Sequence, residues 1–68
     1  MTQQEIGYAI KERRKKLAIN QQTLADLAGV AVNTVVAIER GEGNPQLKKL
    51  LYYLRSITKI YIDMQLNV

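Results

Sequence analysis

Two residue types with versatile chemistry are missing from this sequence, which contains no cysteine and no histidine. The lack of cysteine excludes disulfide bonds, and the two absences together exclude a zinc site made from the usual sulfur and imidazole ligands. Catalysis also lacks candidates, because nucleophilic and general acid–base mechanisms need reactive groups that converge in a cleft. The chain offers one serine, Ser56, and six acidic residues without paired spacing. We therefore predict that the protein is not an enzyme and binds no metal or cofactor.

Long apolar runs are missing as well. No stretch approaches the roughly 18 apolar residues of a membrane-spanning helix. The N-terminus is polar from its second residue, so no signal peptide is visible. We therefore expect a cytoplasmic protein without a membrane partner.

The chain is short and basic. A chain of 68 residues buries only about 60% of its unfolded surface, which leaves a small stability margin. Since disulfides and metal are excluded, the margin must come from close helix packing or from oligomerisation. The net charge of +4 and the pI near 9.6 are compatible with a nucleic-acid partner but do not prove one.

Helix-ending signals divide the first part of the chain into short helices. The first is expected at about 3–17, where Thr2 and Glu5 form a capping box. The second begins after the N-cap residue Asn20 and ends before Gly29, which suits the left-handed position after a helix. The predicted buried side of this second helix consists of Leu24, Ala25, Leu27 and Ala28.

Two further helices are expected. The third covers about 32–40 and ends at Gly41, while Ala31 before it is a poor cap. The fourth begins near Asn44, which can cap it, with Pro45 at the first helical position. Leucines at helical spacing then follow.

The pattern changes after Ser56, where apolar and polar residues alternate. This is the period of a strand, and Thr, Ile and Tyr favour strands. The backbone groups of a strand need a neighbour, and the simplest neighbour is the same strand of a second copy across a two-fold axis. A fifth helix or a frayed tail is the alternative. We predict a helical domain at 1–56 and a dimerisation strand at 57–68, with Ile60, Ile62, Met64 and Leu66 as contact residues.

The second and third predicted helices are joined by a tight turn that contains Gly29, and Ala25 and Ala28 are small enough to let the helices cross closely. This segment resembles the helix-turn-helix of the lambda-repressor-like family, also called Cro/repressor-type or xenobiotic-response-element-type regulators. The resemblance covers about 10–54. It implies an all-α fold of four short helices that binds double-stranded DNA, to which the alternating tail adds the C-terminal β-strand. The residues that carry it are Gln21, Leu24, Ala25, Ala28, Gly29, Val30, Thr34, Val35, Ile38, Glu39, Arg40, Gly41, Asn44 and Pro45.

The third predicted helix has an outer side formed by Asn33, Val36, Ala37 and Arg40, with Val32 at its edge. An α-helix fits the major groove of DNA, where exposed side chains meet base edges. The Asn33 amide can pair with adenine through two hydrogen bonds, and the apolar side chains can contact thymine methyl groups. The alternative is that Val32 and Val36 belong to the core or to a protein interface.

The resemblance implies phosphate contacts around this helix. Gln21 matches the family's glutamine at the start of helix two, which contacts a phosphate and braces the recognition helix, and Gln22 is a weaker candidate. Thr34 matches a hydroxyl residue that donates to a phosphate. Arg40 can neutralise a phosphate, and the backbone amide of Asn44 can meet one. Solvated or locally bonded polar side chains are the alternative.

Arg14 and Glu39 match a pair that links helix one to the recognition helix in the family. A partly buried glutamate needs a charged partner, since an unpaired buried charge is costly. Periodicity alone would choose Arg13, but we follow the resemblance and choose Arg14 for this structural role. Arg13 lies nearer the centre of the first helix's apolar stripe, which consists of Ile6, Ala9, Ile10, Arg13 and Leu17.

We expect a homodimeric transcriptional repressor that reads an inverted-repeat operator, with half-sites about 34–36 Å apart. The alternative is a protein-interaction module. The small size and the expected C-terminal dimerising strand also resemble the HipB-like antitoxins, which bind both their operator and a partner toxin. A pure protein-interaction module, in contrast to either kind of DNA-binding protein, would show no salt-dependent affinity for duplex DNA.

Overall fold

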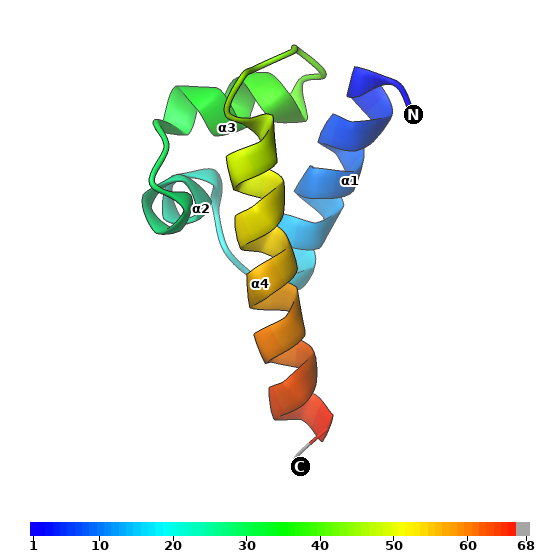
Figure 1. Cartoon of the computed structure of the whole chain (residues 1–68), viewed down its shortest axis with the longest axis vertical. Helices are drawn as coiled ribbons and strands as arrows, with labels where there is room; N and C mark the ends of the chain where they lie inside the picture. Colours follow the sequence, from blue (N-terminus) through cyan, green and yellow to red (C-terminus); the bar gives the residue numbers. More distant parts are fainter. Residues whose placement is uncertain (67–68) are drawn as a thin grey trace.

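The computed structural model describes the backbone of residues 1–66 and the side chains of residues 1–59. Four α-helices follow one another along this part of the chain, and it contains no strand (Figure 1). The prediction of an all-α fold with four helices is therefore confirmed. The helices are α1 (Gln3–Lys16), α2 (Gln21–Ala28), α3 (Val32–Glu39) and α4 (Leu47–Leu66).

The predicted helix caps are present in the structure. The Thr2 hydroxyl accepts from the Glu5 backbone amide at 3.1 Å, and the Glu5 carboxylate accepts from the Thr2 amide at 3.0 Å. At the start of α2, the Asn20 side chain accepts from the Thr23 amide at 2.7 Å. Ala31 makes no side-chain cap bond to α3, as expected of an alanine. Side-chain caps in the local sequence therefore define the starts of α1 and α2, whereas α3 begins without one.

The start of α4 differs from the prediction by two or three residues. The helix begins at Leu47, and Pro45 lies in the turn before it. Asn44 still organises this turn, since its side-chain oxygen accepts from the Gln46 amide at 2.8 Å and its carbonyl accepts from the Leu47 amide at 3.1 Å. Asn44 therefore caps the turn before α4, and the helix itself begins two residues after the predicted first position, Pro45.

The core lies between the four helices and takes residues from each of them. Its fully buried centre consists of Leu24 from α2, Val35 from α3 and Leu50 from α4. Leu27 was expected inside and is 47% exposed. It lies about 100° around α2 from Ala28, and a chain this short does not cover that side. The remaining buried apolar residues are Ile10, Ala25, Ala28, Ile38 and Leu54.

The prediction of a C-terminal strand is wrong. α4 continues without a break across position 56 and stays helical through Leu66, while Asn67 and Val68 lie outside the described residues. A helix satisfies its backbone groups internally, whereas a strand would leave them unpaired in a single chain. On a helix, alternate residues are about 200° apart. Alternate residues of a helix therefore do not share one face, so the predicted strand face of Ile60, Ile62, Met64 and Leu66 does not form.

Candidate nucleic-acid interface

The turn between α2 and α3 fixes the direction of α3. Gly29 has a φ of 71°, in the left-handed region that glycine tolerates best. The Val30 amide donates to the Ala25 carbonyl at 3.0 Å and closes the turn. The Lys49 ammonium donates to the Gly29 carbonyl at 3.1 Å. The turn is thus held both by its own backbone and by α4.

The two sides of α3 have different environments. Val35 and Ile38 are buried on the inner side, whereas Asn33 is exposed on the outer side. Val36 and Ala37 are half-buried. The outer side is therefore largely apolar, with an asparagine amide near its beginning.

Val32 and Arg40 mark the two ends of this outer side. Val32 is half-buried and packs against the core, so it also serves helix packing. Arg40 is exposed and lies 3.9 Å from the Glu42 carboxylate, an exposed pair that contributes little. The Arg40 guanidinium therefore remains accessible to a ligand.

The predicted ion pair between α1 and α3 is present. The Arg14 guanidinium binds Glu39 through two hydrogen bonds, Nε to Oε2 at 2.7 Å and Nη2 to Oε1 at 3.0 Å. Both side chains are almost fully buried, with 11% and 4% of their surfaces exposed. The hydrogen bond to Glu39 raises the pKa of Arg14. Arg13 instead is exposed and donates to Thr58 at 3.2 Å, so the buried pair with Glu39 is made by Arg14 and not by Arg13.

Two further contacts complete this cluster. The Gln21 side-chain amide donates to Glu39 Oε1 at 3.1 Å, and Arg14 Nη1 donates to the Ile19 carbonyl at 3.0 Å. Glu39 therefore accepts from both α1 and α2 while it is itself part of α3. We call Arg14, Gln21 and Glu39 the clamp, because they hold the C-terminal end of α3 in place.

The other predicted phosphate-contacting residues are not joined to the clamp. Gln22 is exposed and donates to the Asp26 carboxylate at 2.8 Å within α2. Thr34 and Asn44 are half-buried. The Asn44 oxygen is occupied by the turn before α4. Their contacts to a phosphate remain predictions.

Gly7 is a positioning residue that the sequence analysis missed. It is buried on α1, and a Cβ atom there would collide with the backbone carbonyl oxygens of Ile38 and Glu39. Glycine thus lets α1 pass directly over the end of α3. An isolated glycine inside a helical pattern is the signal that could have identified it.

The described residues contain neither a candidate metal site nor a membrane-spanning helix. No group of three acidic side chains in the described part of the chain could hold a metal ion. Within the same part, no helix combines the length and the apolar character that crossing a bilayer requires.

Comparisons with known proteins point to the segment that contains the turn and the clamp. Residues 10–52 match the helix-turn-helix family. An uncharacterized HTH-type transcriptional regulator of Methanothermobacter thermautotrophicus is 42% identical over 54 residues, which cover 79% of this chain and 78% of the relative. A second, from Haemophilus influenzae, is 38% identical over 55 residues, which cover 81% of this chain but only 56% of the relative. The matched region includes all of α2 and α3 and the partner residue Arg14.

Proposed function

Because this chain belongs to the helix-turn-helix family of DNA-binding transcriptional regulators, we propose that it represses transcription by placing α3 in the major groove of a specific operator. The observation that carries the proposal is the outward side of α3. It presents Asn33 to solvent, while the clamp holds the other side of the helix. A rigid helix with a free face is what major-groove reading requires.

We assign base reading to the outer side of α3. The Asn33 amide pairs with an adenine through two hydrogen bonds, and Val32, Val36 and Ala37 contact thymine methyl groups. These apolar contacts discriminate between base pairs less strongly than a second side chain hydrogen-bonded to a base would. The operator is therefore defined by a small number of A·T pairs and by the shape of the duplex.

The surrounding polar residues position the helix on the phosphate backbone. Arg40 is the exposed cation at the end of α3 and neutralises one phosphate. Gln21 and Gln22 lie in the first turn of α2, where free amides and the helix dipole favour an anion. Thr34 and the backbone amide of Asn44 add further donors. Such contacts set register and affinity but carry no sequence information.

Asn33 and Arg40 separate these roles experimentally. Operators are first selected from a random pool of duplexes, and binding is then measured by fluorescence anisotropy at several salt concentrations. Asn33→Ala should cost about 1–3 kcal/mol on the selected sequence and relax one base position. Arg40→Ala should weaken selected and random duplexes alike and reduce the salt slope by about 1. Gln3→Ala, which removes an exposed amide from α1, serves as the control for Asn33→Ala.

Two results would end the proposal. One is a selection that enriches no sequence together with affinity that does not change with salt. The other is an equal loss for Asn33→Ala on selected and random duplexes, which would remove the base-reading role. Thermal melts of each variant verify that the fold is intact.

We further propose that the regulator is a homodimer that contacts itself through the distal part of α4, where Ile60, Ile62, Met64 and Leu66 lie. Two copies related by a two-fold axis match an inverted repeat. Sedimentation equilibrium of Ile62→Lys and Leu66→Lys should then show a monomer. Inserting about 5 bp between half-sites, half a helical turn, should abolish tight binding, whereas about 10 bp should restore part of it. A wild-type monomer at all concentrations would refute this mode.

The alternative of an antitoxin is not favoured by any contact in the structure. Both relatives reported above are described as transcriptional regulators. We therefore propose gene regulation as the principal role, and toxin binding is left as a prediction that co-purification with a genomic neighbour would test.

A further inference from the structure

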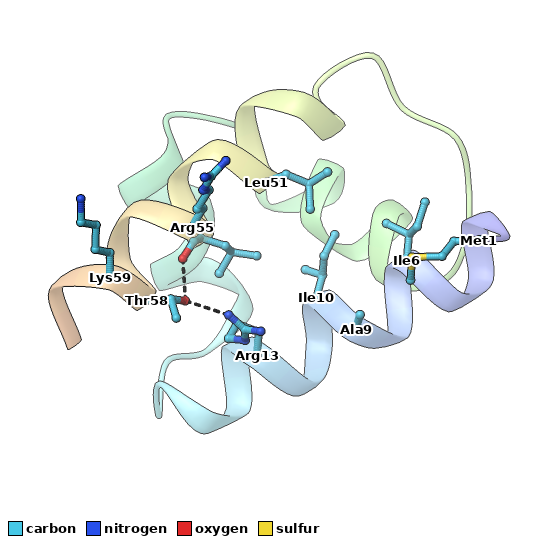
Figure 2. Close-up of a pocket in the computed structure, with 10 residues that line it drawn as sticks. Met1, Ile6, Ala9, Ile10, Arg13, Leu51, Arg55, Thr58 and Lys59 are labelled. Atoms are coloured by element: carbon cyan, nitrogen blue, oxygen red, sulfur yellow. Dashed lines mark hydrogen bonds between the residues drawn. The ribbon is translucent and has the colours of Figure 1, made fainter. Parts of the chain in front are cut away.

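A groove of about 660 Å³ runs between α1 and α4 (Figure 2). Its floor is apolar: Ile10 and Leu54 are buried beneath it, and Ile6 and Leu51 stand at its sides. Leu51 is 41% exposed, although it is a large aliphatic residue in the second turn of α4. The part of the chain whose side chains are described, residues 1–59, therefore leaves an apolar surface uncovered between α1 and α4.

The rim of the groove is positively charged. Arg13 from α1 and Arg55 and Lys59 from α4 line it, and all three are exposed. Arg13 is held in place by its bond to Thr58 at 3.2 Å, which lies at the same end of the groove (Figure 2). No aspartate or glutamate is among the described residues that line the groove. Three cations around an apolar floor attract an apolar surface that carries carboxylates.

The groove lies apart from the DNA-reading side of α3. Its lining comes from α1, α4 and Met1, and no residue of α2 or α3 contributes. On α1, the residues that face α3 are Gly7 and Arg14, about 100° around the helix from Ile6 and Arg13 respectively. An apolar floor also offers nothing to a phosphate. DNA bound at α3 thus leaves this groove free.

The dimensions of the groove suit a short helix. From Ile6 to Arg13 the α1 wall is about 10 Å long at 1.5 Å per residue, which is two helical turns. An amphipathic helix that lies in such a groove inserts residues at i, i+3 or i+4, and i+7. A second copy of this chain is a poor occupant, because an isologous contact would bring the same three cations together. The charge of the rim therefore favours a partner of opposite charge.

We propose that the groove between α1 and α4 binds an amphipathic helix of a partner protein, one whose apolar stripe is flanked by glutamate or aspartate. The apolar side chains of the partner cover Ile6, Ile10 and Leu51, and its carboxylates pair with the rim. The inference goes beyond DNA binding and does not depend on it.

The probe is a synthetic, fluorescein-labelled helix of about 18 residues, long enough to form a helix in water, with leucines at the spacing given above and glutamates beside them. One control peptide replaces every glutamate by lysine, and a second has the same composition in scrambled order. Anisotropy titrations with the full chain should show saturable binding of the acidic peptide. The basic and scrambled peptides should bind roughly tenfold more weakly or not at all.

Matched variants of the chain locate the site. Leu51→Lys should weaken the acidic peptide at least about tenfold, since it places a charge on the apolar floor, whereas Leu27→Lys, at a similarly exposed leucine of α2, should leave it unchanged. Arg55→Glu should weaken it about threefold to tenfold and improve binding of the basic peptide, as expected for a charge pair at a rim. Lys48→Glu, an exposed position of α4 that does not line the groove, is the control for charge alone.

Several results would overturn the proposal. These are equal affinity for the acidic and scrambled peptides, no saturation with any peptide, or equal behaviour of Leu51→Lys and Leu27→Lys. Self-association that Leu51→Lys abolishes would show that a second copy occupies the groove. Loss of DNA affinity in Arg55→Glu would assign the rim to phosphates. Peptide binding that persists in a chain without DNA affinity would refute the proposed function alone.

Discussion

Two sides of the same helix, α1, are covered to very different degrees. On the side toward α3, Gly7 brings backbone against backbone and Arg14 is buried in the clamp. On the side toward the groove, Ala9 and Arg13 remain exposed. With four helices, the chain can cover one side of α1 but not both. The difference teaches that this fold uses its closest packing to orient α3 and leaves the neighbouring side of α1 for other contacts.

The largest expected effect of a substitution is on the covered side. Glu39→Ala removes the acceptor of both Arg14 and Gln21 and leaves a buried guanidinium unpaired, so it should lower the free energy of unfolding by about 3–5 kcal/mol. Urea titration followed by circular dichroism measures this. Glu42→Ala, which removes an exposed partner of Arg40, should stay within about 0.5 kcal/mol of the wild type. Similar losses for both variants would refute the structural role of the clamp.

Gly7→Ala tests the close approach of α1 to α3. In an exposed helix, replacing glycine by alanine stabilises by about 1 kcal/mol. Here the added Cβ has no room beside the Ile38 and Glu39 carbonyls, so we expect a loss of about 1–3 kcal/mol. Gly43→Ala is the control, because its Cβ would meet only the flexible end of Gln3. A gain in stability for Gly7→Ala would mean that the two helices are further apart than described.

Ala18 gives a smaller effect of opposite sign. This residue follows α1 with a φ of 57°, the left-handed region that alanine adopts at a cost. Ala18→Gly should therefore stabilise the fold by about 0.5–1 kcal/mol, after the higher entropy of glycine in the unfolded chain is counted. The same change at Ala9, on the open side of α1, should destabilise by about 1 kcal/mol. Equal signs at the two positions would contradict the assigned backbone conformation.

The smallest effect is a pH dependence at the beginning of α1. Hydrogen bonds from the Thr2 backbone amide and hydroxyl lower the pKa of Glu5. A lowered pKa means that the ionised form stabilises the fold. This contribution is complete above the ordinary glutamate pKa and is lost as the pH falls through the lowered value. Glu5→Gln should therefore slightly lower the melting temperature at neutral pH and make it less sensitive to acid, whereas Glu42→Gln should not reduce the acid sensitivity. An identical acid profile for wild type and Glu5→Gln would exclude the effect.

The helix caps and the turn between α2 and α3 could be predicted from the sequence, because each depends on residues that are close together in the chain. Thr2 with Glu5, Asn20 and Gly29 each act within a few residues, so the spacing in the chain is the spacing in the structure. The pairing of Arg14 with Glu39 is different. Periodicity favoured Arg13, and only the family resemblance selected the right arginine.

The features that could not be predicted depend on how helices meet. Gly7 matters because α1 passes close to the backbone of α3, and this contact depends on the tertiary structure. The groove likewise depends on how α1 and α4 are placed relative to each other. Leu27 was predicted to be buried because it continues the apolar pattern of α2. The other helices cover only part of the apolar surface of α2, and Leu27 lies outside the covered part. After Ser56, the alternation of apolar and polar residues favoured a strand, whereas the structure has a helix. A helix forms its backbone hydrogen bonds internally and needs no second chain to complete them.

The apolar outer side of α3 has a thermodynamic consequence for the proposed operator complex. Val36 and Ala37 retain part of their surface exposed to water in the free chain. Covering that surface with thymine methyl groups releases the water around both partners, so calorimetry of operator binding should record a negative change in heat capacity. Heating would then make the binding enthalpy more favourable, the reverse of what a contact made only of salt bridges to phosphates would give.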